Sequence, residues 1–146
     1  MKKILVCLLA MILLCASACE QDVRWTDQDL ARANSVQIVC YGTEGEQTIF
    51  STHEKEVIQN ISNTFSLLDL EKVRTAETLQ LSYCVYFMND AWDEIDRIYI
   101  LSDNRTVQNS RGKMFRMTDE MDLERHIRQE LLPKMEFLQL VLPDED

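Results

Sequence analysis

The chain has 146 residues, of which 15 are Lys or Arg and 25 are Asp or Glu, so its formal net charge is −10. This acidity repels phosphate backbones, and we expect no nucleic-acid binding. With three glycines and two histidines, the sequence contains no Gly-rich phosphate loop and no G-x-S-x-G nucleophile elbow. We therefore expect one domain with a modest core and no cofactor.

The first eighteen residues have the three parts of a secretion signal. Lys2 and Lys3 supply a positive start, residues 4–14 form an apolar run, and residues 16–18 are Ala-Ser-Ala. The apolar run is shorter than the roughly 20 residues that a membrane-spanning helix needs. We therefore predict a signal peptide over residues 1–18.

Cys19 follows this signal directly. The stretch Ala16-Ser17-Ala18-Cys19 resembles the lipobox of bacterial lipoproteins, although Ala16 stands where Leu is commonest. The resemblance implies that Cys19 is diacylated and anchors the chain to the membrane. The alternative is ordinary cleavage before Cys19 followed by secretion.

Residues 19–34 are polar and acidic, with no sustained apolar period. We predict that they form a tether between the lipidated cysteine and a single domain over residues 35–146. Trp25 is the one large apolar residue of this tether. We expect it to dock onto the domain, and the alternative is a place at the membrane interface.

The first half of the domain predicts a hairpin followed by a helix. Residues 35–41 and 46–51 alternate like strands around a turn that contains Gly42 and Gly45. Ser51 and Glu54 have capping-box spacing and predict the start of a helix. The apolar stripe of this helix has helical spacing, with Val57, Ile58, Ile61, Phe65 and Leu68. The charged residues 69–78 are expected to form a connection.

The second half predicts a meander of strands and a last helix. Strands are expected over 79–88, 94–102, 106–109 and 113–117. The last helix would begin after a Thr118 or Asp119 cap, bear an apolar stripe and end or bend at Pro133. Its stripe consists of Leu123, Ile127 and Leu131. For residues 134–146, helix and strand both remain open.

This order predicts an α+β fold with an antiparallel sheet of five or six strands, helices packed on one face and the order ββαβββ(β)α. The lipobox-like start, the acidic tether, this order and the segment Ile98-Tyr99-Ile100-Leu101-Ser102-Asp103-Asn104 are similar to small, uncharacterised cell-envelope lipoproteins of Gram-positive bacteria. The resemblance implies a surface location and carries no catalytic residues.

Two cysteines remain in the predicted domain, Cys40 and Cys84, each on a predicted strand. Outside the cytoplasm such a pair can form a disulfide. The alternative is two buried thiols on neighbouring strands that stay reduced. In that case the thiols are inert, and neither supports nucleophilic catalysis with His53 or His126.

The closest approach to a metal-binding pattern is Asp122, His126 and Glu130, at positions i, i+4 and i+8 of the last helix. On a straight helix these side chains would line one face. A single helix seldom supplies the convergent ligands that a metal needs. We therefore expect a solvated helix face and no metal site.

The turn after residue 88 combines an aromatic side chain with acids. Asp90, Asp93, Glu94 and Asp96 surround Trp92. They do not fit a calcium loop, because the turn has no glycine. One interpretation is a recognition tip for a basic partner, with Trp92 as anchor and Asp90, Asp93 and Glu94 beside it. The alternative is that Trp92 folds onto the sheet and the acidic residues keep the turn soluble.

Two functions of different classes follow. The first is a non-enzymatic, lipid-anchored binding module on the outer face of the bacterial cell membrane, acting on a basic envelope protein or peptide as an inhibitor or immunity-type protein would. The second is a small envelope hydrolase or metal-dependent enzyme. A structural spacer without a specific partner is the third interpretation. We expect no enzymatic activity.

Overall fold

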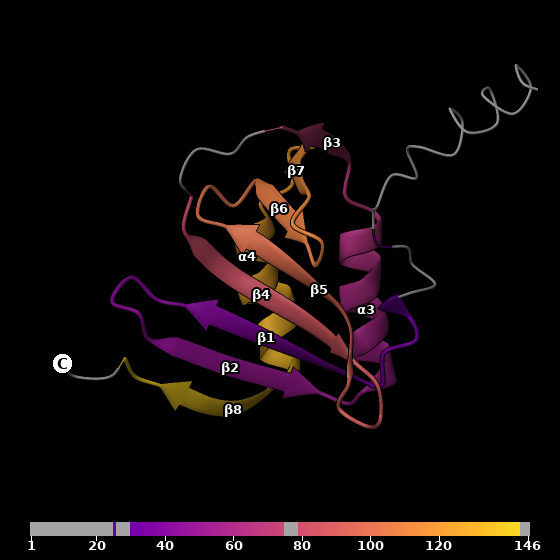
Figure 1. The fold of residues 1–146 in the computed structure, drawn as a ribbon. Coiled ribbons are helices and arrows are strands. Elements are labelled where there is room, and N and C mark those ends of the chain that lie inside the picture. Colours follow the sequence, from indigo (N-terminus) through magenta and orange to yellow (C-terminus); the bar gives the residue numbers. More distant parts are fainter. Residues whose placement is uncertain (1–24, 26–29, 75–78, 144–146) are drawn as a thin grey trace, which may run out of the picture.

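The computed structural model describes residue 25 and residues 30–74 and 79–143. The predicted signal peptide, Cys19 and the first part of the tether lie outside these residues. The described chain forms one eight-stranded sheet in which every neighbouring pair is antiparallel. Its strand order is β3-β7-β6-β5-β4-β1-β2-β8 (Figure 1).

The strands are short and follow one another closely along the chain. Their bounds are β1 Ser35–Tyr41, β2 Gln47–Thr52, β3 Leu70–Val73, β4 Leu81–Met88, β5 Glu94–Leu101, β6 Thr106–Asn109, β7 Met114–Met117 and β8 Glu136–Val141. The helical elements are α3 Lys55–Ser66, α4 Leu123–His126, the π-helix η1 Ile127–Leu131 and the 3-10 helix η2 Leu132–Lys134.

The core is built from alternate residues of the central strands. Tyr83, Val85 and Phe87 of β4 are buried, and in the register Val85 lies opposite Ile38. Because successive residues of a strand point to opposite faces, such alternation places one apolar set on the core side. The other face of the sheet carries polar and aromatic side chains, among them Tyr86, Tyr99 and Arg97.

Helix α3 supplies much of the remaining core. Its apolar stripe is buried as its spacing predicts, with Val57, Ile58, Ile61 and Phe65. Its start differs from the prediction, because Ser51 belongs to β2 and pairs with Gln37. The helix begins after Glu54, which makes no side-chain cap, and Thr52 Oγ1 accepts from Glu54 N at 3.1 Å. Ser51 therefore pairs within the sheet instead of capping the helix.

The predicted fold class is wrong. One eight-stranded sheet dominates the described chain, and the helical part is short, whereas we expected five or six strands with helices packed on one face. The additional strands are β3, in the stretch predicted as a connection, and β8, in the stretch that remained open. Both are edge strands. They are held by backbone hydrogen bonds, which the pattern of side chains along the sequence does not reveal.

The folded part of the chain also begins earlier than Ser35. Trp25, Leu30 and Ala33 belong to the core, with exposed fractions of 4%, 0% and 7%. Trp25 Nε1 donates to the Phe65 carbonyl oxygen at 2.9 Å, and its ring meets Phe115 edge-on. Trp25 therefore docks onto the domain, and the C-terminal part of the predicted tether is packed rather than free.

Strand β8 is the one edge that presents apolar side chains to solvent. All six of its residues are exposed, and Phe137, Leu138 and Leu140 are exposed by more than half. The ring of Phe137 packs edge-on against Phe50 of β2. This strand lies at the opposite edge of the sheet from β3.

We expect Ile61→Ala to destabilise the protein by about 2–5 kcal/mol, because it removes a fully buried branched side chain and leaves a cavity beneath α3. Gln59→Ala, on the exposed side of the same helix, is the matched control and should change the free energy of unfolding by less than about 0.5 kcal/mol. Urea denaturation of both variants measures the difference. Equal effects would contradict this assignment of the core.

Candidate functional site

The candidate site lies where three neighbouring strands end. In the sheet order β4-β1-β2, antiparallel pairing brings together the end of β4, the start of β1 and the end of β2. Ser35 is paired with Met88, and Val36 with Thr52. Asn34 N donates to the Met88 carbonyl oxygen at 2.8 Å, so the chain is tied to β4 just before β1 begins.

The turn between β4 and β5 is held by the side chain of Asn89. Asn89 Oδ1 accepts from the backbone N–H groups of Ala91 and Asp93, each at 2.9 Å. Asn89 Nδ2 donates to Asp93 Oδ2 at 3.2 Å, and Trp92 N donates to the Asn89 carbonyl oxygen at 3.1 Å. The turn is therefore preorganised before any partner binds.

Trp92 lies within this turn and has an unusual backbone conformation. Its φ is 64°, in the left-handed region that bulky residues rarely adopt. Such a conformation costs about 1–3 kcal/mol and persists only where the surroundings impose it. The side chain is 59% exposed, and its ring meets the His53 ring edge-on at 5.5 Å between centres. Trp92 therefore does not fold onto the sheet.

A small polar cavity of about 60 Å³ lies between the turn and the strand ends. Its lining residues are Asn34, Ser35, His53, Asn89, Asp90 and Trp92. We call these six residues the Trp92 site. Ser35 is 2% exposed, and its Oγ has no hydrogen-bond partner in the described chain. A buried hydroxyl without a partner is uncommon, and leaving it so costs about 1–3 kcal/mol.

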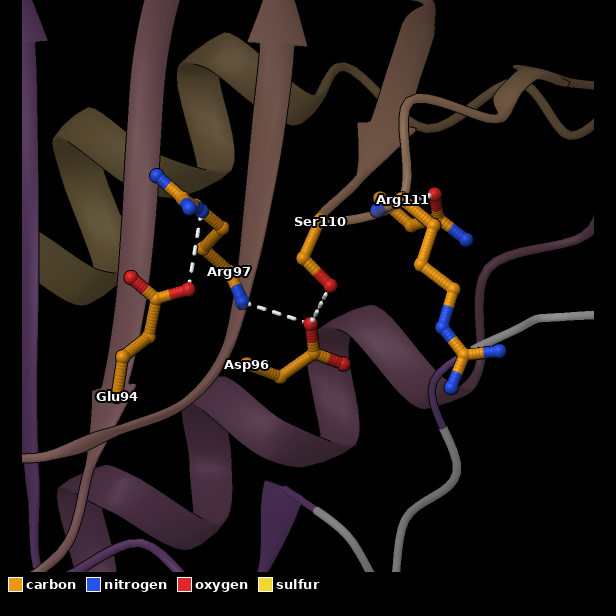
Figure 2. Close-up of polar contacts among 6 residues, drawn as sticks. Glu94, Asp96, Arg97, Ser110 and Arg111 are labelled. Carbon is orange, nitrogen blue, oxygen red and sulfur yellow. Dashed lines mark hydrogen bonds and ion pairs between the residues drawn. The ribbon is translucent and has the colours of Figure 1, made fainter.

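The structure separates the predicted recognition residues. Trp92 and Asp90 line the cavity, whereas Asp93 is bonded to Asn89 and Glu94 lies outside. Figure 2 shows Glu94 Oε1 beside Arg97 Nε, at 3.0 Å. In the same view Asp96 accepts from Ser110 Oγ at 2.7 Å and from its neighbour Arg97 N at 2.8 Å. Only part of the acidic cluster therefore belongs to the site.

The sequence interpretation missed Ser35, Asn34 and His53 as site residues. Ser35 is the first residue of β1 and His53 directly follows β2, and both come close to the β4–β5 turn only through strand pairing. His53 precedes Glu54, the N-cap of α3, and so lies before the helix, whereas a helix capped by Ser51 would have placed His53 in its first turn. No local motif marks these positions.

Cys40 and Cys84 are free cysteines. In the pairing of β1 with β4, Cys40 lies opposite Tyr83 and Cys84 lies opposite Val39. Paired residues share a face and successive residues alternate, so the two thiols project from opposite faces of the sheet. This register does not permit a disulfide between them. The interpretation of Cys40 and Cys84 as a disulfide pair is therefore wrong.

The predicted face of Asp122, His126 and Glu130 does not converge on a metal. Asp122 caps α4 by accepting from Arg125 N at 3.0 Å, and His126 Nε2 lies 3.0 Å from Thr64 Oγ1 of α3. Asp122, His126 and Glu130 nevertheless line one hollow of about 450 Å³. Within the described ranges, no group of three or more His, Cys, Asp or Glu side chains is placed to hold a metal ion.

No protein family, curated protein or solved structure matches this chain. Over residues 30–74 and 79–143, none of the helices is both long enough and apolar enough to cross a bilayer.

Both thiols should destabilise the fold in alkali. Burial raises the pKa of Cys40 and of Cys84 from 9.0 to about 11. Between these values the folded protein holds a proton that the unfolded chain releases, so stability is retained below pH 9 and falls as the pH rises to 11. For the fully buried Cys84 the loss is on the order of 2 kcal/mol.

Urea denaturation at pH 8 and pH 11 measures this loss. Cys84→Ala should reduce the drop in unfolding free energy between the two pH values, whatever its effect at pH 8. A drop of the same size in Cys84→Ala would show that other groups account for it.

Proposed function

We propose that this protein is a lipid-anchored, extracytoplasmic binding module that recognises a basic envelope protein or peptide through the Trp92 site. The observation that carries the proposal is the exposed Trp92, held in a left-handed conformation beside a small polar cavity. Rigid, exposed aromatic anchors beside a pocket are typical of interaction hot spots. The strain at Trp92 is consistent with a functional constraint.

The charge of the chain supports a basic partner. The net charge is −10, and the predicted loss of residues 1–18 would remove two lysines and no acid. Asp90 and Asp93 are exposed beside Trp92. Opposite charge speeds association and favours basic surfaces over acidic ones. An inhibitor or immunity-type protein that blocks a basic envelope protein fits this chemistry.

The second candidate is a small hydrolase, because Ser35, His53 and Asp90 share one cavity. A serine nucleophile needs a hydrogen bond to its base. Ser35 Oγ makes none in the described chain, and the residue is almost fully buried. Both observations support binding over catalysis at this site. Neither Cys40 nor Cys84 offers a reactive thiolate, since burial raises the pKa of each.

The partner test is co-purification from detergent-solubilised native membranes, with mass spectrometry of the bait and its partners. We expect one basic envelope protein to accompany the wild-type chain and to be lost with Trp92→Ala. Phe137→Ala is the matched control, because Phe137 is an equally exposed aromatic residue that does not line the Trp92 site. Retention of the partner by Trp92→Ala, or its loss with both variants, would contradict the proposal.

The anchor has its own test. Cys19→Ser removes the acylated thiol that the lipobox-like stretch implies, and with it the membrane binding that the acyl chains provide. We expect the wild-type protein in the membrane fraction with a diacylated N-terminal Cys19, and the variant in the soluble fraction or uncleaved. Equal partitioning of both into the soluble fraction would favour secretion instead.

A further inference from the structure

The outer edge of β8 concentrates the exposed apolar side chains of the described chain. Of the seven large apolar side chains that are exposed in residues 30–74 and 79–143, five lie in one stretch: Phe137, Leu138, Leu140, Val141 and Leu142. We call residues 137–142 the β8 edge. A contiguous exposed apolar surface marks an interaction site, whereas single exposed apolar residues are ordinary.

The two edges of the sheet differ in how they exclude other strands. Strand β3 has four residues, of which Glu71 and Lys72 are charged and exposed. Short, charged edge strands resist pairing with another chain. Strand β8 has six residues, and its one charged residue is Glu136 at the first position. Because β8 is the outermost strand (Figure 1), half of its backbone N–H and C=O groups point away from β2 and are open to a further strand.

The chemistry of the β8 edge favours an apolar strand as its neighbour. Residues 137–142 carry no charge, so a basic segment would find no acid along them. The strand is followed closely by Asp144, Glu145 and Asp146, and these charges would be repelled by an anionic lipid surface. A second copy of the chain offers an apolar strand of the same length.

The register of β8 makes it complementary to itself. Phe137 is paired with Phe50 and Leu140 with Thr48, and the register shifts by one residue between these pairs. Phe50 and Thr48 are two residues apart on β2 and share a face. The shift therefore places Phe137 and Leu140 on one face as well, although they are three residues apart.

A two-fold axis between Leu138 and Gln139 would use this arrangement. Antiparallel pairing about that axis sets Phe137 of one copy opposite Leu140 of the second copy, and by symmetry the contact occurs twice. Directly opposite residues share a face, so the two apolar side chains meet.

The charges and the area of the edge agree with this pairing. Antiparallel pairing brings the exposed Lys134, which precedes β8, toward Pro143 of the second copy, after which the acids begin. This opposite charge offsets part of the repulsion between two acidic chains. Together the ten apolar side chains of two edges expose on the order of 1,000 Å², which is about the lower limit of a specific interface.

We propose that two copies of this chain associate through antiparallel pairing of their β8 edges, which joins the two sheets into one. The inference does not rest on the proposed function, because no residue of the Trp92 site belongs to the β8 edge.

The test uses two differently tagged full-length chains, co-expressed in the native host and solubilised in mild detergent. Capture of one tag should recover the other. Leu140→Lys in both chains should reduce this recovery about tenfold or more, because the two-fold axis brings two unpaired lysines into the apolar contact. Leu67→Lys is the matched control, since Leu67 is an exposed leucine at the end of α3, and it should leave recovery unchanged.

A second variant covers the case in which Leu140→Lys disturbs β8 within the single chain, which urea denaturation detects. Leu142 lies just beyond the strand and is 67% exposed, so Leu142→Lys removes little packing from the single chain. It should also lower recovery. Unchanged recovery with folded Leu140→Lys or with Leu142→Lys, or an equal loss with Leu67→Lys, would overturn the proposal.

Trp92→Ala separates direct pairing from bridging by the proposed basic partner. Unchanged recovery in this variant supports pairing through β8, and loss of recovery would overturn it. If Leu140→Lys leaves recovery unchanged but abolishes binding of the Cys19→Ser chain to phosphatidylcholine vesicles, the β8 edge faces lipid and the proposal is wrong. A single, unpaired chain that still binds a basic partner through Trp92 would refute this inference alone.

Discussion

The pairing of β1 with β4 on one side and with β2 on the other is the constraint on which the rest of the structure depends. It buries Val36 and Ile38, whose partners in β4 are Phe87 and Val85, and it aligns the three strand ends at one end of the sheet. Because strand side chains alternate with a period of two, a slip of one residue would send the apolar set of β1 to the open face. The register is therefore strongly determined.

The same register also determines what the cysteines and the Trp92 site can do. It places Cys40 and Cys84 on opposite faces, and it brings Ser35 beside Met88 at the base of the β4–β5 turn. Several hydrogen bonds then converge on Asn89, and they offset the cost of the left-handed Trp92. The stability of the core thus supports a strained turn and an unpartnered hydroxyl at its margin. Such departures from the lowest local energy are commonest at binding sites.

Much of the secondary structure was predictable because the apolar residues that face the core recur at a regular spacing in the sequence. The stripe of α3 is found in its buried residues. In β4 the predicted apolar face is buried at Tyr83, Val85 and Phe87, although Cys84 and Met88 on the other face are buried too. The failures occurred where pairing or packing overrode a local signal. Ser51 joined β2 rather than capping a helix, and β3 formed from a charged segment because β7 offered backbone partners. Leu30 and Ala33 are buried although they belong to a polar, acidic stretch of the sequence.

The sequence by itself determined the acidity of the chain, the signal-like start before Cys19, and the apolar periods of α3 and the central strands. Those properties depend on residue type and spacing along one segment. The eight-strand order, the opposed cysteines and the cavity of Ser35, His53, Asp90 and Trp92 were decided only by the tertiary structure. The physical reason is that each requires contact between segments far apart in the chain, and the register of paired strands, which no single segment encodes, determines those contacts.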